Sequence, residues 1–106
     1  MAYYNKLVRD QVPGTLRAGG RRVVTRTILG KELLAALRAK VDEELGEFDA
    51  AATDELAAAE LADLLEVLVA LAKARGCSEA KLNELRAQKA ATRGAFDRAL
   101  LLLEVE

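Results

Sequence analysis

Several residue types are absent or scarce in this chain of 106 residues. It has no histidine, no tryptophan, one cysteine and one proline. The lack of histidine excludes the most common general base and histidine-ligated zinc sites. The single cysteine, Cys77, cannot form a disulfide within the chain, which favours a reducing compartment. Any bound metal ion must therefore be held by oxygen ligands, and such ligands favour Mg²⁺ or Mn²⁺.

Large side chains are also few. The chain is 52% hydrophobic, but Ala and Leu supply most of this fraction and only two Tyr and two Phe are present. Such a short chain buries little surface by itself. We therefore expect one domain, residues 1–106, that associates into an oligomer. We find no signal peptide and no apolar run of membrane-spanning length, so we expect a cytoplasmic protein with no membrane partner.

The charges are segregated, although the formal net charge is only −1. Residues 1–31 contain seven Lys or Arg and one acid, residues 32–66 contain eleven acids and two bases, and residues 67–106 contain seven bases and five acids. An acidic centre between basic ends fits a metal site that meets a polyanion such as a nucleotide. The acidic centre would repel a phosphate backbone, so we expect no nucleic-acid partner.

Apolar periodicity predicts a mainly all-α fold. We expect one helix over residues 31–52, a second from a cap at Thr53 or Asp54 to about residue 75, and a third from Ser78 to about residue 92. Pro13 and Gly14 should interrupt regular structure, leaving a helical turn over residues 15–18. The β-branched segment 22–29 (RVVTRTIL) predicts a strand. The tail (ALLLLEVE) either pairs with that strand in a small β element or adds a helical turn.

Four acids fall on the inward flanks of the two central helices. At about 100° per residue, Glu44 lies inside the apolar arc of the first helix and Glu47 lies at its edge. Glu60 and Asp63 occupy the equivalent flank of the second helix. A short connection makes the two helices antiparallel neighbours, so the four carboxylates can converge. By contrast, Glu43 should face solvent.

Converging carboxylates repel one another and lose hydration, which costs several kcal/mol for an unpaired buried charge. A divalent cation with oxygen ligands removes this cost, and Mg²⁺ usually keeps positions open for substrate phosphates. The alternative is that each acid pair is simply solvated. We expect a Mg²⁺ site, with Mn²⁺ as a substitute, at these four acids.

The sequence around the acids resembles a known family. The motifs EELGE (residues 43–47) and ELAD (residues 60–63) are similar to the ExxE…ExxD pattern of MazG-like, all-α nucleoside triphosphate pyrophosphohydrolases. The opening YNKLVRDQVP (residues 4–13) and the stretch KAATRGAF (residues 89–96) resemble the two ends of a short branch whose proteins are labelled phosphoribosyl-ATP pyrophosphohydrolase-like. The resemblance therefore spans nearly the whole chain.

This resemblance implies a helical bundle completed by a second subunit, as a homodimer or homotetramer. It also implies Mg²⁺-dependent cleavage between the α- and β-phosphates of a nucleotide, including non-standard ones, to a monophosphate and pyrophosphate. Glu44, Glu47, Glu60 and Asp63 would be the metal ligands. The sequence departs from larger members of the family, which carry an additional Asn or Asp where this chain has VLVA (residues 67–70).

Basic side chains should meet the phosphates of such a substrate. The candidates are Lys6, Arg9, Lys40, Lys89 and Arg93. For Lys89 and Arg93 the alternative is a solvated basic face, and for Lys40 it is a structural salt bridge with Glu44 and Glu47. Tyr3, Tyr4 and Phe96 are expected to pack rather than to bind a base.

Two other functions stay open. One is phosphoribosyl-ATP pyrophosphohydrolase activity in histidine synthesis, which uses the same bond and metal. The other is a non-enzymatic helical interaction module whose acidic hairpin is only an association surface.

Overall fold

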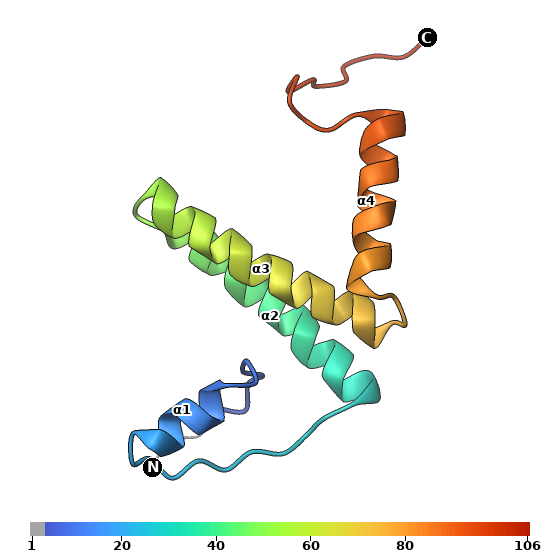
Figure 1. Cartoon of the computed structure of the whole chain (residues 1–106). Coiled ribbons are helices and arrows are strands. Elements are labelled where there is room, and N and C mark those ends of the chain that lie inside the picture. Colours follow the sequence, from blue (N-terminus) through green and yellow to red (C-terminus); the bar gives the residue numbers. More distant parts are fainter. Residues whose placement is uncertain (1–3) are drawn as a thin grey trace.

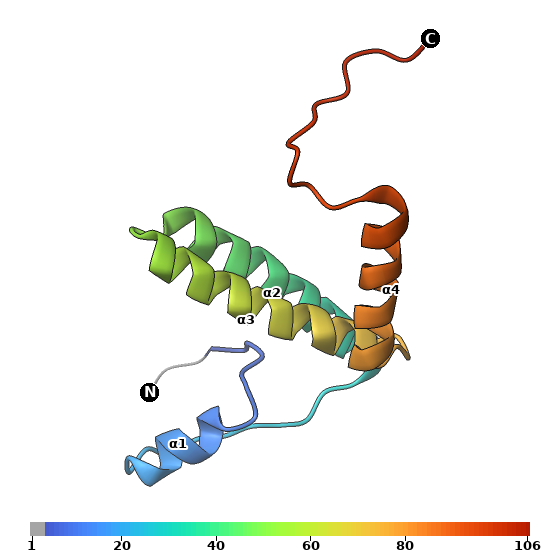
Figure 2. The same ribbon diagram turned by 45° about the horizontal axis from the view of Figure 1, so that its top comes forward.

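The protein is all-helical in the computed structural model, which describes residues 4–106 and so leaves Tyr3 outside. The four helices are α1 (Val12–Ala18), α2 (Gly30–Ala50), α3 (Asp54–Ala74) and α4 (Glu79–Arg93). Helices α2 and α3 lie side by side as a hairpin, and α4 meets only the end of α3 before it rises away (Figure 1). The short helix α1 lies apart from the hairpin, to which a long segment connects it (Figure 2).

Local signals determine where the long helices begin and end. The side chain of Thr53 accepts a hydrogen bond from the Leu56 backbone amide at 3.2 Å, and Asp54 and Glu55 occupy the first turn of α3. Gly76 ends α3 with φ of 83°, and the Cys77 amide donates back to the Ala72 carbonyl at 2.8 Å. This arrangement is a Schellman motif. The expected boundaries of both central helices are therefore confirmed to within two residues.

Two local predictions are wrong. Pro13 does not interrupt regular structure but lies in the first turn of α1, where its missing amide hydrogen leaves no bond unmade. No strand is present among residues 4–106: segment 22–29 and the tail after α4 both lack a ladder. A strand requires a partner, and these two segments lie at opposite ends of the molecule (Figure 1).

The core is thin. Leu37 on α2, 4% exposed, is the buried apolar side chain among the described residues, and Glu44 is the buried charged one. Tyr4 and Phe96 are 72% and 96% exposed, so neither packs in a core within one copy, contrary to expectation. The radius of gyration is 17.9 Å, whereas a compact domain of this length has about 13 Å. One copy therefore leaves much of its apolar surface in water.

Among residues 4–106, no helix combines the length and the apolar character that crossing a bilayer requires.

Candidate metal centre

Three of the four predicted ligands lie together between α2 and α3. Glu44, Glu47 and Glu60 each offer a carboxylate oxygen, and the three oxygens lie within 4.8 Å of one another. The i, i+3 spacing places Glu44 and Glu47 on one face of α2, and the antiparallel hairpin brings Glu60 of α3 opposite them. We call these three residues the acid cluster.

The acid cluster is partly withdrawn from water. Glu44 is buried, Glu60 is half-buried and Glu47 is exposed. One carboxylate oxygen of Glu44 and one of Glu60 (Oε2 in both) are buried with no hydrogen-bond partner in the described part of the chain. Most buried polar atoms in proteins have a partner, so two orphaned acceptors in one cluster require an explanation.

Burial and mutual repulsion change the acidity of the cluster. Loss of hydration raises the pKa of Glu44 from 4.5 to about 7, and the nearby Glu60, Glu47 and Asp63 carboxylates add to this effect. The neighbouring Glu47 carboxylate and burial raise the pKa of Glu60 as well. At lower pH, a proton on Glu44 can form a hydrogen bond to Glu60. At higher pH both carboxylates are charged, and a cation between them would offset their repulsion.

The donor set fits a divalent cation of the hard type. It consists only of carboxylate oxygens, as Mg²⁺ and Mn²⁺ prefer, and it is open on the Glu47 side. An oxygen-ligated ion would give the unpartnered oxygens of Glu44 and Glu60 a partner, and this fit supports a proposal.

Asp63, the fourth predicted ligand, has a different partner. Its Oδ1 lies 2.6 Å from Nη2 of Arg9, which belongs to the segment before α1. Asp63 is still close enough for its charge to raise the pKa of Glu44. The structure therefore places Asp63 beside the acid cluster, neutralised by Arg9.

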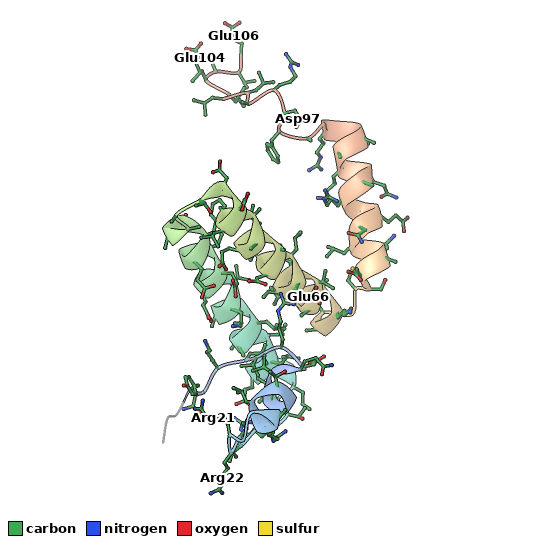
Figure 3. The ribbon with its side chains drawn as sticks, turned by 60° about the vertical axis from the view of Figure 1, so that its left-hand side comes forward. Arg21, Arg22, Glu66, Asp97, Glu104 and Glu106 are labelled. Carbon is green, nitrogen blue, oxygen red and sulfur yellow. The ribbon has the colours of Figure 1, made fainter. Side chains whose placement is uncertain are left out.

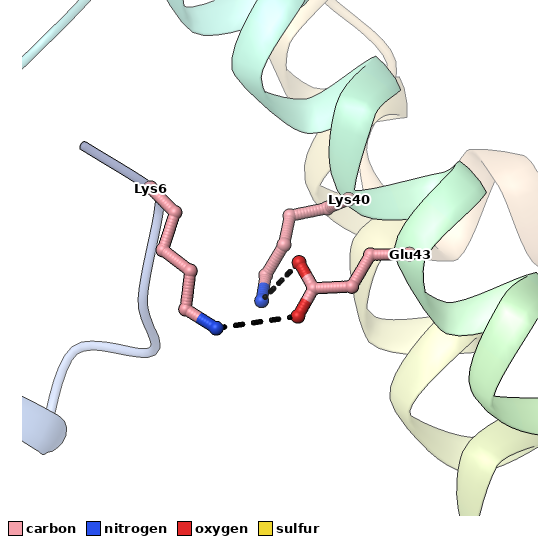
Figure 4. Close-up of polar contacts among 3 residues, drawn as sticks. All are labelled: Lys6, Lys40 and Glu43. Carbon is pink, nitrogen blue, oxygen red and sulfur yellow. Dashed lines mark hydrogen bonds and ion pairs between the residues drawn. The ribbon is translucent and has the colours of Figure 1, made fainter. Parts of the chain in front are cut away.

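Two predicted phosphate ligands meet at an acid that we expected to face solvent. Lys6 and Lys40 both pair with Glu43, at 3.4 and 3.3 Å (Figure 4). The expectation that Glu43 is a simple solvent residue is therefore wrong. Burial acts to raise its pKa, but the two ammonium groups outweigh burial and lower it. Helical spacing could not show that Lys6 pairs with Glu43, because Lys6 comes from a segment that has no helical period.

Lys40 also differs from its predicted environment. It pairs with Glu43 rather than with Glu44 or Glu47, and its side chain is only 18% exposed. A small cavity of about 80 Å³ lies between the segment around Lys6 and the face of α2 that carries Lys40 and Glu43. A substrate phosphate would therefore compete with Glu43 for these two cations.

Helix α4 holds the other two predicted phosphate ligands away from the site. Lys89 and Arg93 lie in its second half, which projects away from the α2–α3 hairpin (Figures 1 and 2). Within the described part of one copy, neither residue pairs with an acid of the cluster. A single copy therefore does not assemble all five predicted cations around the acids.

Comparison with known proteins adds little about function. No family model matches the chain. No solved structure matches it significantly. It is 50% identical over 52 residues to an uncharacterised protein of Mycolicibacterium smegmatis, a match that covers 49% of this chain and 53% of that protein. The matched part thus spans about half of the relative's length.

Proposed function

We propose that this protein is a Mg²⁺-dependent nucleotide pyrophosphohydrolase that cleaves the α–β phosphate bond of a nucleoside triphosphate, including non-standard ones. The observation that supports the proposal is the pair of buried, unpartnered oxygens of Glu44 and Glu60 within the acid cluster. The resemblance of the motifs around these residues to MazG-like enzymes supplies the reaction type. Mn²⁺ is the expected substitute metal.

In this proposal the acid cluster holds the metal. Glu44, Glu47 and Glu60 would be ligands, and Asp63 would join them if a substrate phosphate drew Arg9 away. The ion, when bound, would neutralise phosphate charge and lower the pKa of water near it. One of these carboxylates, or a neighbouring one, would orient the attacking water and accept its proton.

The chain's own cations would hold the phosphates. Arg9 is positioned by Asp63 next to the acid cluster, and Lys6 and Lys40 are positioned by Glu43 one residue before Glu44. Arg9 therefore lies beside the acid cluster, and Lys6 and Lys40 are held together at Glu43 on α2, before a substrate arrives. Fixed cations contribute to phosphoryl chemistry mainly through positioning and electrostatic stabilisation.

The proposal includes association into a homodimer or homotetramer. Leu61, Leu65 and Leu68 on α3 are 43%, 62% and 39% exposed in one copy. A second hairpin packed on these side chains would bury them. Lys89 and Arg93 would then contribute to a site only if α4 of one copy reaches the acid cluster of another.

Release of pyrophosphate from a panel of nucleotides tests the activity. Glu44→Gln keeps the shape of the side chain but removes its charge, and we expect a loss of at least about a hundredfold, or about 2.7 kcal/mol of transition-state stabilisation. The matched control is Glu66→Gln, an exposed acid of the same hairpin, which should leave turnover unchanged. Equal turnover by wild type and Glu44→Gln would refute the assignment. Turnover of phosphoribosyl-ATP alone would favour the histidine-synthesis alternative.

The exposed apolar side chains also favour a second candidate, a helical interaction module without activity. Calorimetric titration with Mg²⁺ or Mn²⁺ separates the two candidates. The enzyme should bind a divalent ion in a manner that Glu44→Gln abolishes, whereas an interaction module should show no specific uptake.

A further inference from the structure

Two segments at opposite ends of the molecule have the same unusual character. Residues 21–29, between α1 and α2, and residues 100–106, after α4, contain neither helix nor ladder in this structure. Both carry apolar side chains that lie in water. Val24 and Leu29 are 83% and 74% exposed in the first segment, and Leu101 and Leu103 are 84% and 82% exposed in the second.

The two segments carry opposite charges. Residues 21–29 contain Arg21, Arg22 and Arg26 and no acid, whereas residues 100–106 contain Glu104 and Glu106 and no base. Arg26 pairs with Glu32. Among the pairs formed by residues 4–106, none involves Arg21, Arg22, Glu104 or Glu106. Complementary charges of this kind fix partner and register.

One chain cannot join them in this arrangement. Arg21 and Arg22 lie at one extreme of the molecule, and Glu104 and Glu106 lie at the other (Figure 3). The molecule is 62 Å long along its principal axis. Backbone groups of an extended, β-branched segment nevertheless form a ready template for another strand.

We infer that the tail of one copy pairs as a β-strand with residues 21–29 of a second copy. If each of two copies gives its tail to the other, both segments of each chain gain a partner and the assembly stops at two copies. The inference concerns residues outside the acid cluster and does not rest on the proposed activity.

The charges select the direction of the pairing, and we place Glu104 opposite Arg22, which sets its parity. The acids lie at the end of the tail and the arginines at the start of the other segment, so the strands must run antiparallel for them to meet. Successive side chains of a strand point to opposite faces. Even positions of the tail (Leu102, Glu104) therefore share a face with even positions of the other segment (Arg22, Val24). Odd positions of the tail share a face with Thr25.

Disulfide cross-linking tests which residues of the two strands share a face. It uses two full-length copies that can be told apart by size. In a Cys77→Ala background, one copy carries Thr25→Cys and the other carries Leu101→Cys, Leu102→Cys or Leu103→Cys. Each chain then has one cysteine, so a disulfide must join two copies. We expect Thr25→Cys to join Leu101→Cys and Leu103→Cys at least about fivefold faster than Leu102→Cys, and Val24→Cys to reverse this preference. Equal rates at all three tail positions, or no cross-linking, would overturn the inference.

A charge exchange provides the second measurement. Arg22→Glu on the Thr25→Cys copy, or Glu104→Arg on the Leu103→Cys copy, should slow cross-linking at least about threefold, because like charges then oppose each other. The two changes together should restore the rate. If the combined variants stay slow, the charges do not guide the pairing and the inference fails. Both segments lie outside the helices, and unchanged helical circular dichroism will verify that each variant folds.

Discussion

Nη2 of Arg9 lies 2.6 Å from Oδ1 of Asp63, so a cation from the segment before α1 neutralises an acid beside the cluster of Glu44, Glu47 and Glu60. This pair joins residues 54 positions apart in the sequence. Arg9 is a candidate to bind phosphate and Asp63 is a candidate to bind the metal ion. Phosphate must therefore compete with Asp63 for Arg9, and the metal ion must compete with Arg9 for Asp63.

The first prediction follows from this competition. Arg9→Gln frees Asp63 and removes a positive charge beside the acid cluster, so Mg²⁺ should bind a few times more tightly. The same change should raise KM for a nucleotide about tenfold, because a charge-assisted hydrogen bond to phosphate is lost. Both Arg9 and Asp63 are largely exposed, so the free energy of unfolding should change by less than about 1 kcal/mol.

Calorimetry and steady-state kinetics measure these two effects. Arg38→Gln is the control, since it breaks the exposed pair with Asp42 on α2 and leaves the acid cluster intact. Weaker Mg²⁺ binding by Arg9→Gln would show that Arg9 does not compete with the metal.

The second prediction concerns pH. The folded-state pKa of Glu44, about 7, is above its ordinary value of 4.5. The folded state therefore holds a proton that the unfolded state has lost, and the contribution of this group to the free energy of unfolding falls as pH rises from about 4.5 to about 7. Glu44→Gln stays neutral, so without metal it should become more stable than wild type above about pH 7.

Urea denaturation in the presence of a chelator, at acidic and at alkaline pH, measures this difference. Addition of Mg²⁺ at alkaline pH should stabilise wild type and not Glu44→Gln. The exposed Glu66→Gln should follow wild type at every pH. If Glu44→Gln and wild type keep the same stability difference across the range, the carboxylate of Glu44 is not destabilised by its surroundings.

The third prediction concerns the core. Leu37 on α2, at 4% exposure, is the buried apolar side chain among the described residues. Leu37→Ala should lower the free energy of unfolding by about 2–3 kcal/mol, through lost burial and the cavity left behind. Leu56→Ala, at a side chain 54% exposed, should cost less than about 1 kcal/mol. Urea denaturation compares the two, and equal costs would contradict a core centred on Leu37.

The fourth prediction concerns association through the hairpin. Leu65→Glu places a charge on a side chain that is 62% exposed in one copy, so it should cost little in an isolated chain. Burial of that charge against a second hairpin would cost several kcal/mol, so the variant should lose this contact and sediment more slowly than wild type. Ala59→Glu, on the solvent flank of the same helix, is the matched control and should leave association unchanged. An unchanged sedimentation coefficient for Leu65→Glu would exclude this face as the interface.

Much of the fold follows from local patterns that a sequence displays directly. The boundaries of α2 and α3 depend on apolar spacing and on the Thr53 and Gly76 caps, which act within a few residues. The grouping of Glu44, Glu47 and Glu60 follows from helical spacing plus a short antiparallel connection. The strand prediction for residues 22–29 failed because β-branched composition records a preference, while a strand needs a partner.

The sequence alone thus determined the three long helices, the caps of α3 and α4 and the grouping of Glu44, Glu47 and Glu60, since each of these depends on local spacing and short connections. Only the tertiary structure decided that Glu43 holds Lys6 and Lys40, that Arg9 neutralises Asp63, and that Lys89 and Arg93 stand away from the acid cluster. The physical reason is that residues 4–10 are held by ion pairs to acids 37 and 54 positions away, and that the turn after α3 sets the direction of α4. No periodicity in the sequence encodes either arrangement.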